Sequence, residues 1–388
     1  MKSVSRRGSP IVPHAGPLRQ AQDKLTGMMQ KTHKKRRFTL IGFFLAYLFL
    51  FLLFFTSPAP AEGLPLVWVV STGGTIAEKI DPATGAAVPA VSGDDLLKAV
   101  PGLKKVARIK VFELCNIDSS HMTPEIWRNL SLKVNELLAD SDVKGVVVTH
   151  GTDTMAEAAF FLELTVTSRK PVVFVGAMRN ASELSPDGPA NIMNAVLQVC
   201  SDAAANWGVT VTLNNYVNSA WHVKKTQSTN VQTFVSGPYG YLGYIIMGKI
   251  LRYQDQGLFL KFPIPQKLPK VAVLTTFAGD DGSLIRHAVA EGAKGLVIEG
   301  VGAGNVNPEV RNAIKDALAR NIPVIITTRV EWGGVVPAYG DIGGAADLKR
   351  IGAVLSSRID TYKARLLLIL ALAQPDFSVE KLKTYFKY

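Results

Sequence analysis

A run of apolar residues that ends in a pair of glycines places the strongest constraint on the fold of this 388-residue chain. The run extends from Leu66 to Val70 and is followed by Ser71-Thr72-Gly73-Gly74-Thr75-Ile76-Ala77. Such a segment is typical of a buried strand that leads into a tight turn. The turn would leave Thr75 at the carboxyl end of the strand, which is where open α/β sheets bind ligands. A purely structural Gly-rich turn is an equally good interpretation of these residues alone.

Beyond this segment, short apolar runs alternate with segments of helical periodicity. The expected strands cover residues 106–114, 146–148, 172–175 and 209–213, and the expected helices cover 124–138, 154–165 and 189–200. This alternation predicts βαβ units, and therefore an α/β fold with a mostly parallel, doubly wound sheet covered on both faces. The pattern predicts that residues 66–247 form a larger N-terminal α/β domain.

The periodicity lapses in residues 248–269, where glycine and proline indicate a linker. Further strands are expected at 271–274, 296–298 and 324–326, with helices at 283–291, 308–320, 360–372 and 378–386. Residues 270–388 are therefore predicted to form a second, smaller α/β domain.

The first 61 residues differ from the rest in charge and hydropathy. They hold ten of the 43 Lys and Arg residues and one of the 31 acidic residues, so the net charge of +12 falls near +3 for the remainder. The predicted fold therefore has no charge excess that would favour nucleic acid as a partner.

Residues 1–61 have the layout of a secretory leader. A basic cluster at residues 31–37 precedes an apolar run from Phe38 to Phe55, and small residues at Ala59 and Ala61 suit cleavage after Ala61. This predicts a Sec signal peptide and a periplasmic or secreted protein. The apolar run is also just long enough for a retained membrane anchor, so both interpretations stand. Residues 1–27 lack such a pattern, and Met28 or Met29 would begin a conventional leader.

Cysteine and histidine give no sign of a metal site. Cys115 and Cys200 lie in apolar segments and are expected as buried free thiols rather than as a disulfide. The six histidines are scattered without ligand spacing, so no metal and no cofactor are predicted.

A second strand end carries further polar side chains. Val146-Val147-Val148 leads into Thr149-His150-Gly151-Thr152-Asp153-Thr154. In a parallel sheet, this strand would bring Thr152 and Asp153 to the same edge as Thr75. The sequence Thr-Asp-Thr before a helix is also typical of an N-cap, so a capping role is a full alternative.

Two more segments have the composition of a site. Gly176-Ala177-Met178-Arg179 follows the next strand, and its glycine, together with Asp187-Gly188-Pro189, suits either a pocket wall or a structural loop. Lys225, in Val223-Lys224-Lys225-Thr226, would be an ordinary surface charge unless the fold places it beside Thr152 and Asp153.

Together these segments resemble the bacterial type II L-asparaginases, in order and in spacing. The similarity covers residues 66–388, and any one segment would be weak, whereas the set is specific. The matching segments are Thr72-Gly73-Gly74-Thr75-Ile76-Ala77, Thr149-His150-Gly151-Thr152-Asp153-Thr154-Met155, Gly176-Ala177-Met178-Arg179, Lys225-Thr226, Ala99-Val100-Pro101, Asn116-Ile117-Asp118-Ser119, Asp187-Gly188-Pro189 and Lys363-Ala364-Arg365-Leu366.

The resemblance implies hydrolysis of L-asparagine to L-aspartate and ammonia, with some L-glutamine activity, through a threonine acyl-enzyme. It implies that Thr75 is the nucleophile and that Thr152, Asp153 and Lys225 form a second catalytic set. The backbone N–H groups of Gly74 and Thr152 would hold the oxyanion. Ser119 would bind the α-carboxylate of the substrate, and Asp153 would pair with its α-amino group. The implied substrate-binding residues are Gly74, Ser119, Ser120, Thr152, Asp153 and Ala177. The resemblance also implies a homotetramer built from close dimers.

The chain departs from the family pattern in two loops. Members usually carry a tyrosine just after the Gly-Gly-Thr turn, whereas this chain has Ala86-Ala87-Val88 there and no tyrosine between Tyr47 and Tyr216. The region that corresponds to the family's intersubunit acidic residue, 329–341, has no clear match. We hypothesise that Tyr339, from the same or a neighbouring chain, replaces the missing phenol; a simple packing role is an equal alternative.

Two other classes of function are alternatives to the hydrolase. The missing tyrosine would suit a periplasmic amino-acid-binding protein that retains the scaffold, but such a protein has no need of a threonine nucleophile. The Gly-rich first turn could suggest a dinucleotide-binding dehydrogenase, yet it lacks the Gly-x-Gly-x-x-Gly spacing.

Overall fold

Eight strands form the larger of the two main sheets, in the order β12-β11-β8-β7-β6-β5-β1-β4. Five neighbouring strands are parallel: β7 (Val209–Leu213), β6 (Val172–Val175), β5 (Val143–Thr149), β1 (Leu66–Gly73) and β4 (Arg108–Ile117). Three antiparallel strands extend the sheet beyond β7: β8 (Tyr216–Ser219), β11 (Gly243–Ile246) and β12 (Lys249–Arg252). The mostly parallel sheet expected from the sequence is confirmed.

The structure is a computed structural model that describes residues 63–80, 83–84, 87–89, 95, 98–257 and 260–386. The expected leader, with its apolar run 38–55 and the cleavage position at Ala61, lies outside the described residues. Among the helices that are described, none has the length and apolar character needed to span a bilayer.

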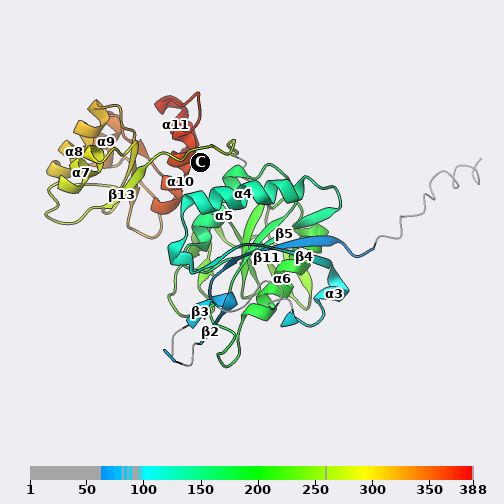
Figure 1. Cartoon of the computed structure of the whole chain (residues 1–388). Coiled ribbons are helices and arrows are strands. Elements are labelled where there is room, and N and C mark those ends of the chain that lie inside the picture. Colours follow the sequence, from blue (N-terminus) through cyan, green and yellow to red (C-terminus); the bar gives the residue numbers. More distant parts are fainter. Residues whose placement is uncertain are drawn as a thin grey trace, which may run out of the picture. The chain divides into compact units, whose positions relative to one another are not determined.

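Both faces of the larger sheet are buried. Along β1, Leu66 and Val70 belong to one apolar cluster, whereas Val67 and Val69 belong to another. Helices α4 (Pro124–Leu138) and α5 (Met155–Thr165) cover the first face, and α3 (Leu103–Val106) and α6 (Gly188–Cys200) cover the second (Figure 1). Because both faces are covered, the central strands appear in the sequence as continuous apolar runs.

The order of the strands creates a switch point between β1 and β5. From β1 the chain reaches β4 by way of α3 on one face, and it then returns over the opposite face through α4 to enter β5. At such a point the connections diverge and leave a crevice at the carboxyl ends of the two strands. Thr75 follows β1 and Thr152 follows β5 directly at this crevice.

The smaller sheet contains four parallel strands in the order β13 (Val271–Thr275), β14 (Gly295–Gly300), β15 (Val324–Thr328) and β16 (Val354–Leu355). Helices α7 (Ser283–Ala290), α8 (Pro308–Ala319) and α9 (Ala345–Arg350) pack on one face, and α10 (Thr361–Leu372) and α11 (Val379–Tyr385) lie on the other (Figure 1). The second, smaller α/β domain is therefore confirmed as a fold class.

The two sheets share an apolar core. Side chains of α10 belong to the same buried cluster as those of α5 and as Val297 and Ile325 of the smaller sheet. The region Leu64–Tyr388 forms one compact unit for this reason.

The chain differs from the sequence-based expectation where strands are short or exposed. The segment 248–269, expected as a linker, begins with β12, the outer strand of the larger sheet. Ile246 and Leu251, on the hairpin β11–β12, are each about half exposed, at 46% and 45%. An edge hairpin with one face open to water has no continuous apolar run, which is the signal used for the inner strands.

Candidate active site

Two glycines bring the ends of β1 and β5 together. Gly73 and Gly74 have φ angles of 97° and 83°, which favour glycine. A Cβ on Gly74 would lie 2.1 Å from the Cα of Gly151, so neither position accepts a side chain. The buried Thr72 hydroxyl donates to the carbonyl of Thr149 at 2.8 Å and fastens the same two strand ends. Thr75 directly follows Gly74, and Thr152 directly follows Gly151.

Thr75 opens a short 3-10 turn, Thr75–Ala77, and is half-buried. Among the residues that the structure describes, its side chain forms no hydrogen bond. The hydroxyl is therefore not committed to a structural partner, as a nucleophile requires.

Lys225 joins Thr152 and Asp153 in one hydrogen-bonded set. Its Nζ donates to Thr152 Oγ1 at 2.9 Å and to Asp153 Oδ1 at 2.7 Å. Thr152 is 5% exposed, whereas the carboxylate of Asp153 is largely open to solvent. A lysine 72 residues away in sequence is thus placed beside both strand-end residues, and it is not an isolated surface charge.

The capping interpretation of Thr152-Asp153-Thr154 does not hold. Thr154 occupies the N-cap position of α5 but makes no capping hydrogen bond, since its hydroxyl donates to the carbonyl of Ser119 at 2.8 Å. Asp153 instead accepts from Lys225, as described above. The side chains of Asp153 and Thr154 therefore bond to Lys225 and Ser119, and they do not cap α5.

Ser119 contacts the segment Gly151–Asp153, which follows β5. It is buried, and its Oγ accepts from the backbone N–H of Asp153 at 3.2 Å. Gly151 leaves room for it, because a Cβ there would lie 2.5 Å from that Oγ. The exposed Ser120 follows, and its N–H donates to Asp118 at 2.7 Å. The hydrogen bonds from Ser120 hold the pKa of Asp118 below its usual value.

The segment that contains Ala177 is fixed by a clasp from α6. Asp187 accepts from the backbone N–H groups of Met178 and Arg179 at 3.1 and 2.9 Å, and Asn191 donates to the carbonyl of Gly176 at 3.0 Å. Ala177 is buried and lines a cavity of about 230 Å3 together with Ile76, the residue after Thr75. The segment that contains Ala177 therefore forms a wall of the same cavity as Ile76, in the turn after β1.

His150 is a buried neutral residue of the second motif. Its Nδ1 lies 2.7 Å from the carbonyl oxygen of Gly151, which can only accept, so this nitrogen carries the proton. Burial lowers the pKa of His150 to about 4. The ring thus holds the carbonyl of Gly151 without adding a charge to the crevice.

Glu157 was not identified from the sequence. It lies one helical turn after Asp153, and both residues line a cavity of about 400 Å3 that also reaches Lys225. Burial raises the pKa of Glu157 to about 7. The four-residue spacing from Asp153 was the available signal, because it places both carboxylates on one helix face.

Two expected contributions are not seen within this chain. The Gly74 N–H donates to the carbonyl of Ile117 at 3.1 Å in this structure, and its role in holding the oxyanion stays a prediction. The side chain of Tyr339 is 57% exposed and makes no hydrogen bond among the described residues. Its backbone carbonyl accepts from Ala346 of α9 at 3.0 Å, within the smaller sheet's layer. A role for Tyr339 from a neighbouring chain stays a prediction.

The described residues contain no cluster of His, Cys, Asp or Glu that could hold a metal ion. Cys115 and Cys200 are free and half-buried, and burial raises the pKa of both thiols.

Comparisons with known proteins cover nearly all of the described chain. The family model "Asparaginase, N-terminal" matches residues 66–257, and the model "Glutaminase/Asparaginase C-terminal domain" matches residues 270–386. The boundary between the two matches falls after β12.

Individual relatives give the same result. "Probable L-asparaginase periplasmic" of Haemophilus influenzae is 38% identical over 326 residues, which is 82% of this chain and 91% of that protein. "L-asparaginase 2" of Escherichia coli is 38% identical over 322 residues, 81% of this chain and 90% of that protein. The crystal structure titled as a probable cytoplasmic L-asparaginase from Campylobacter jejuni has a TM-score of 0.75 and 38% identity, and covers 83% of this chain and 99% of that one.

Proposed function

This chain is an enzyme of the asparaginase family, and from that premise we propose that it hydrolyses L-asparagine to L-aspartate and ammonia with Thr75 as the nucleophile. The observation that carries this proposal is the hydrogen-bonded set Thr152, Asp153 and Lys225 after β5, next to the end of β1 that precedes Thr75, since Gly74 packs against Gly151. Homologues named L-asparaginase support asparagine as the substrate.

The reaction divides one difficult step into two easier ones. Thr75 Oγ attacks the side-chain carbonyl carbon of asparagine, its proton passes to the departing nitrogen, and ammonia leaves an aspartyl ester on Thr75. A water molecule then attacks this ester and releases aspartate, which restores the Thr75 hydroxyl. Lys225 and Thr152 are the pair placed to move the proton, since they already share a hydrogen bond of 2.9 Å.

The oxyanion of the tetrahedral intermediate needs a backbone donor. The Thr152 N–H has no acceptor among the residues that the structure describes, whereas the Gly74 N–H is bonded to Ile117. We therefore assign this role to Thr152. Removing one donor of this kind typically lowers kcat by about 10²–10³-fold.

The charged ends of the amino acid would be held on either side of Asp153. One oxygen of Asp153 accepts from Lys225, which leaves the other for the α-ammonium group. Ser119 Oγ accepts from the N–H of Asp153, and its own proton can be donated to the α-carboxylate. Ser120 and Ala177 complete the proposed binding surface.

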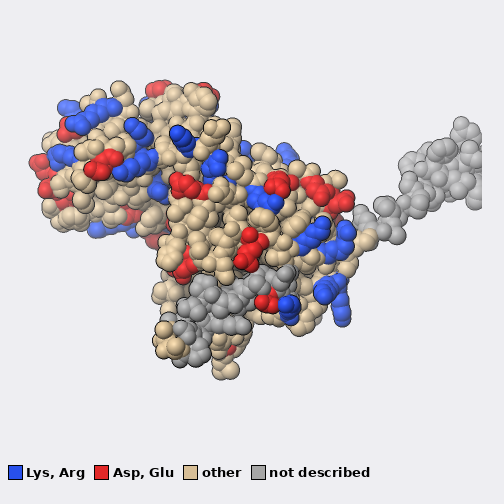
Figure 2. Space-filling view, viewed as in Figure 1, with Lys and Arg blue, Asp and Glu red and all other residues tan. Residues whose placement is uncertain are grey.

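Glutamine would be a secondary substrate. It is longer than asparagine by one methylene group, and a pocket discriminates against such a difference by only about 1–3 kcal/mol. On the face shown in Figure 2, Lys and Arg side chains lie interspersed with Asp and Glu side chains.

Export and assembly form part of the proposal. The basic cluster and apolar run before Ala61 support secretion to the periplasm or beyond, and one relative carries the word periplasmic in its name. We also propose a homotetramer made of close dimers, in which a neighbouring chain could supply the phenol of Tyr339.

The test is ammonia release from L-asparagine and from L-glutamine by the wild-type protein and by Thr75→Ala and Thr152→Ala. Both variants should lose activity, whereas Thr384→Ala, an exposed threonine on α11, should not change it. Mass spectrometry after rapid quenching should place an aspartyl group on the peptide that contains Thr75. Tight binding of asparagine by the wild type without ammonia release would instead indicate a binding protein.

A further inference from the structure

Lys225 is carried by a hairpin that lies outside both main sheets. Among the strands that the structure describes, β9 (Lys224–Lys225) pairs with β10 (Phe234–Val235) alone, and the two form a separate two-stranded sheet. A two-stranded hairpin alone is marginally stable in water. The position of Lys225 therefore depends on what packs against this hairpin.

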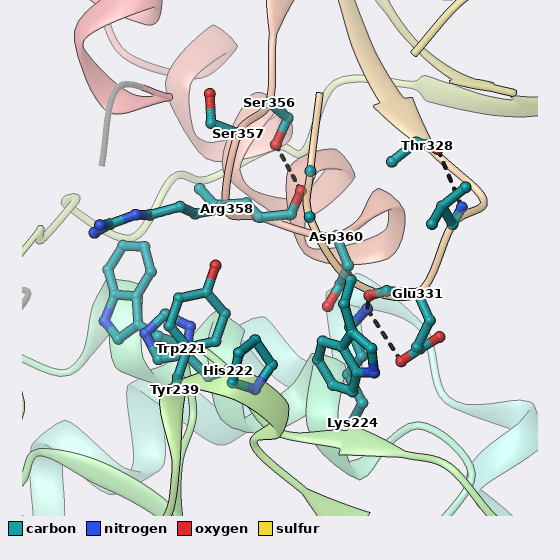
Figure 3. A pocket seen from close by; sticks show the side chains of 16 residues that line it. Trp221, His222, Lys224, Tyr239, Thr328, Glu331, Ser356, Ser357, Arg358 and Asp360 are labelled. Carbon is teal, nitrogen blue, oxygen red and sulfur yellow. Dashed lines mark hydrogen bonds and ion pairs between the residues drawn. The ribbon is translucent and has the colours of Figure 1, made fainter. Parts of the chain in front are cut away.

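Neighbouring residues on β9 face in opposite directions. Lys225 points to Thr152 and Asp153, and Lys224 consequently points away from them, as expected from the alternation of side chains along a strand. Lys224 meets the loop that follows β15. Its Nζ donates to the carbonyl of Glu331 at 3.1 Å and lies 3.3 Å from Glu331 Oε1. Figure 3 shows this contact.

The next residue of that loop, Trp332, contacts β9 and the segment that follows β10. The Nζ of Lys224 lies 4.9 Å from the centroid of the Trp332 ring, a cation–π distance. The ring also covers Gly237, two residues after β10, where an added Cβ would lie 2.3 Å from ring carbons. Trp332 thus packs against both Lys224, the first residue of β9, and Gly237, which follows β10.

A second contact fixes the chain just before β9. Lys363 of α10 is buried, and its Nζ donates to the carbonyl oxygens of Trp221 and Val223 at 3.1 and 2.6 Å. The hairpin is therefore fastened from two sides by residues of the C-terminal region, although it carries a residue of the N-terminal crevice.

We propose that Trp332 and Glu331 are positioning residues, which keep Lys225 within hydrogen-bond distance of Thr152 and Asp153 by clamping the β9–β10 hairpin. The inference rests on the proposed function, because Lys225 is assigned its role there. In this proposal both residues act through Lys224 and the hairpin rather than on the reacting atoms. Their contribution is the geometry of the proton transfer, in which a displacement of about 1 Å can lower the rate up to about 100-fold.

The test compares kcat, KM and Tm for L-asparagine hydrolysis in a small set of variants. Trp332→Ala should lower kcat at least about tenfold, with KM for asparagine within about twofold of the wild type and Tm within a few degrees. Trp332→Phe keeps a ring over Gly237 and should recover most of the lost kcat. Lys224→Met removes the cation from the same contact and should reproduce the loss.

Ile342→Ala is the matched control, since Ile342 lies on the same loop, ten residues after Trp332, and is 62% exposed. Its kcat should equal that of the wild type. Wild-type kcat in Trp332→Ala, or an equal loss in Ile342→Ala, would overturn the proposal.

Hydrogen exchange separates this inference from the proposed function. The amide of Thr226, bonded to the carbonyl of Thr233 at 2.8 Å, reports on the hairpin whether or not the protein is active. It should exchange faster in Trp332→Ala, whereas amides of β1 and β5 should be unchanged. Unchanged exchange at Thr226 would refute the clamp, even if the wild type proved to be an asparaginase.

Discussion

Gly74 and Gly151 lie against one another so closely that a Cβ on the first would be 2.1 Å from the Cα of the second. This contact sets the separation of the two strand ends that carry Thr75 and Thr152. Hydroxyl side chains alone would not form a site, because any bulk between the glycines would move the two threonines apart.

The first prediction concerns Gly151→Ala. The new Cβ would lie 2.5 Å from Ser119 Oγ and 3.1 Å from the Cα of Gly74, so the strand ends must separate. We expect kcat to fall by at least about 100-fold. The measurement is steady-state ammonia release, with circular dichroism to verify folding. Gly292→Ala is a suitable control for handling and purity, because a Cβ there meets nothing within 4 Å and only its φ angle of 81° is strained. Near-normal turnover in Gly151→Ala would contradict the tight-contact interpretation.

The second prediction concerns Lys225→Met. The change removes the Nζ that donates to Thr152 and Asp153 while keeping a side chain of similar length. Because general acid–base groups contribute about 10²–10⁴-fold, kcat should fall by that order. Lys144→Met is the control, since Lys144 forms an exposed ion pair with Asp202 at 3.2 Å and exposed pairs contribute little. A Lys225→Met enzyme with at least half of the wild-type kcat would exclude Lys225 from proton transfer.

The third prediction concerns Glu157→Gln and alkaline stability. Burial raises the pKa of Glu157 from 4.5 to about 7, so the native state binds its proton more tightly than the unfolded state. The resulting stability is fully present below pH 4.5 and is lost as the pH rises through 7, by up to roughly 3 kcal/mol. Urea unfolding of both proteins at pH 5 and pH 8 measures this. Glu157→Gln should become more stable relative to the wild type as the pH rises, and a pH-independent difference would contradict the shift.

The fourth prediction concerns His150 and acid. Burial lowers the pKa of His150 from 6.5 to about 4, so this group contributes stability that is present above pH 6.5 and is lost as the pH falls through 4. The full contribution amounts to roughly 3 kcal/mol. The free energy of unfolding should be measured at pH 6.5 and at pH 4 for both proteins. The decrease between these two pH values should be larger for the wild type than for His150→Asn. Equal losses would show that His150 does not remain neutral in the native state.

Much of the fold follows from local patterns. The strands Val172–Val175 and Val209–Leu213 and the helix Pro124–Leu138 have the bounds that the sequence predicts. Each is an apolar run or a periodic helix with clear ends, such as Thr123, whose hydroxyl accepts from the N–H of Ile126 at 3.3 Å. By contrast, β8, β11 and β12 are stabilised by pairing across the sheet edge, for which a short strand carries no periodic signal.

The site was predictable where it lies at strand ends, and not where it depends on long-range packing. The positions of Thr75 and Thr152 could be predicted because each residue comes after a parallel strand and a Gly-containing turn. Lys225 is 73 residues from Thr152, and nothing local distinguishes it from Lys224, whose Nζ contacts Glu331 instead. The raised pKa of Glu157 arises from burial, near charges of α10 that are more than 200 residues away in sequence.

The shared cluster between α5 and α10 limits how this enzyme can be divided. Nine of the eleven residues of α5 are buried, and its hydrophobic surface faces the larger sheet on one side and α10 on another. A fragment that ended at residue 257 would keep Thr75, Thr152, Asp153 and Lys225, yet would expose that surface to water. The two matched segments are thus separate in sequence but depend on each other for stability. Neither segment alone is expected to form a working enzyme.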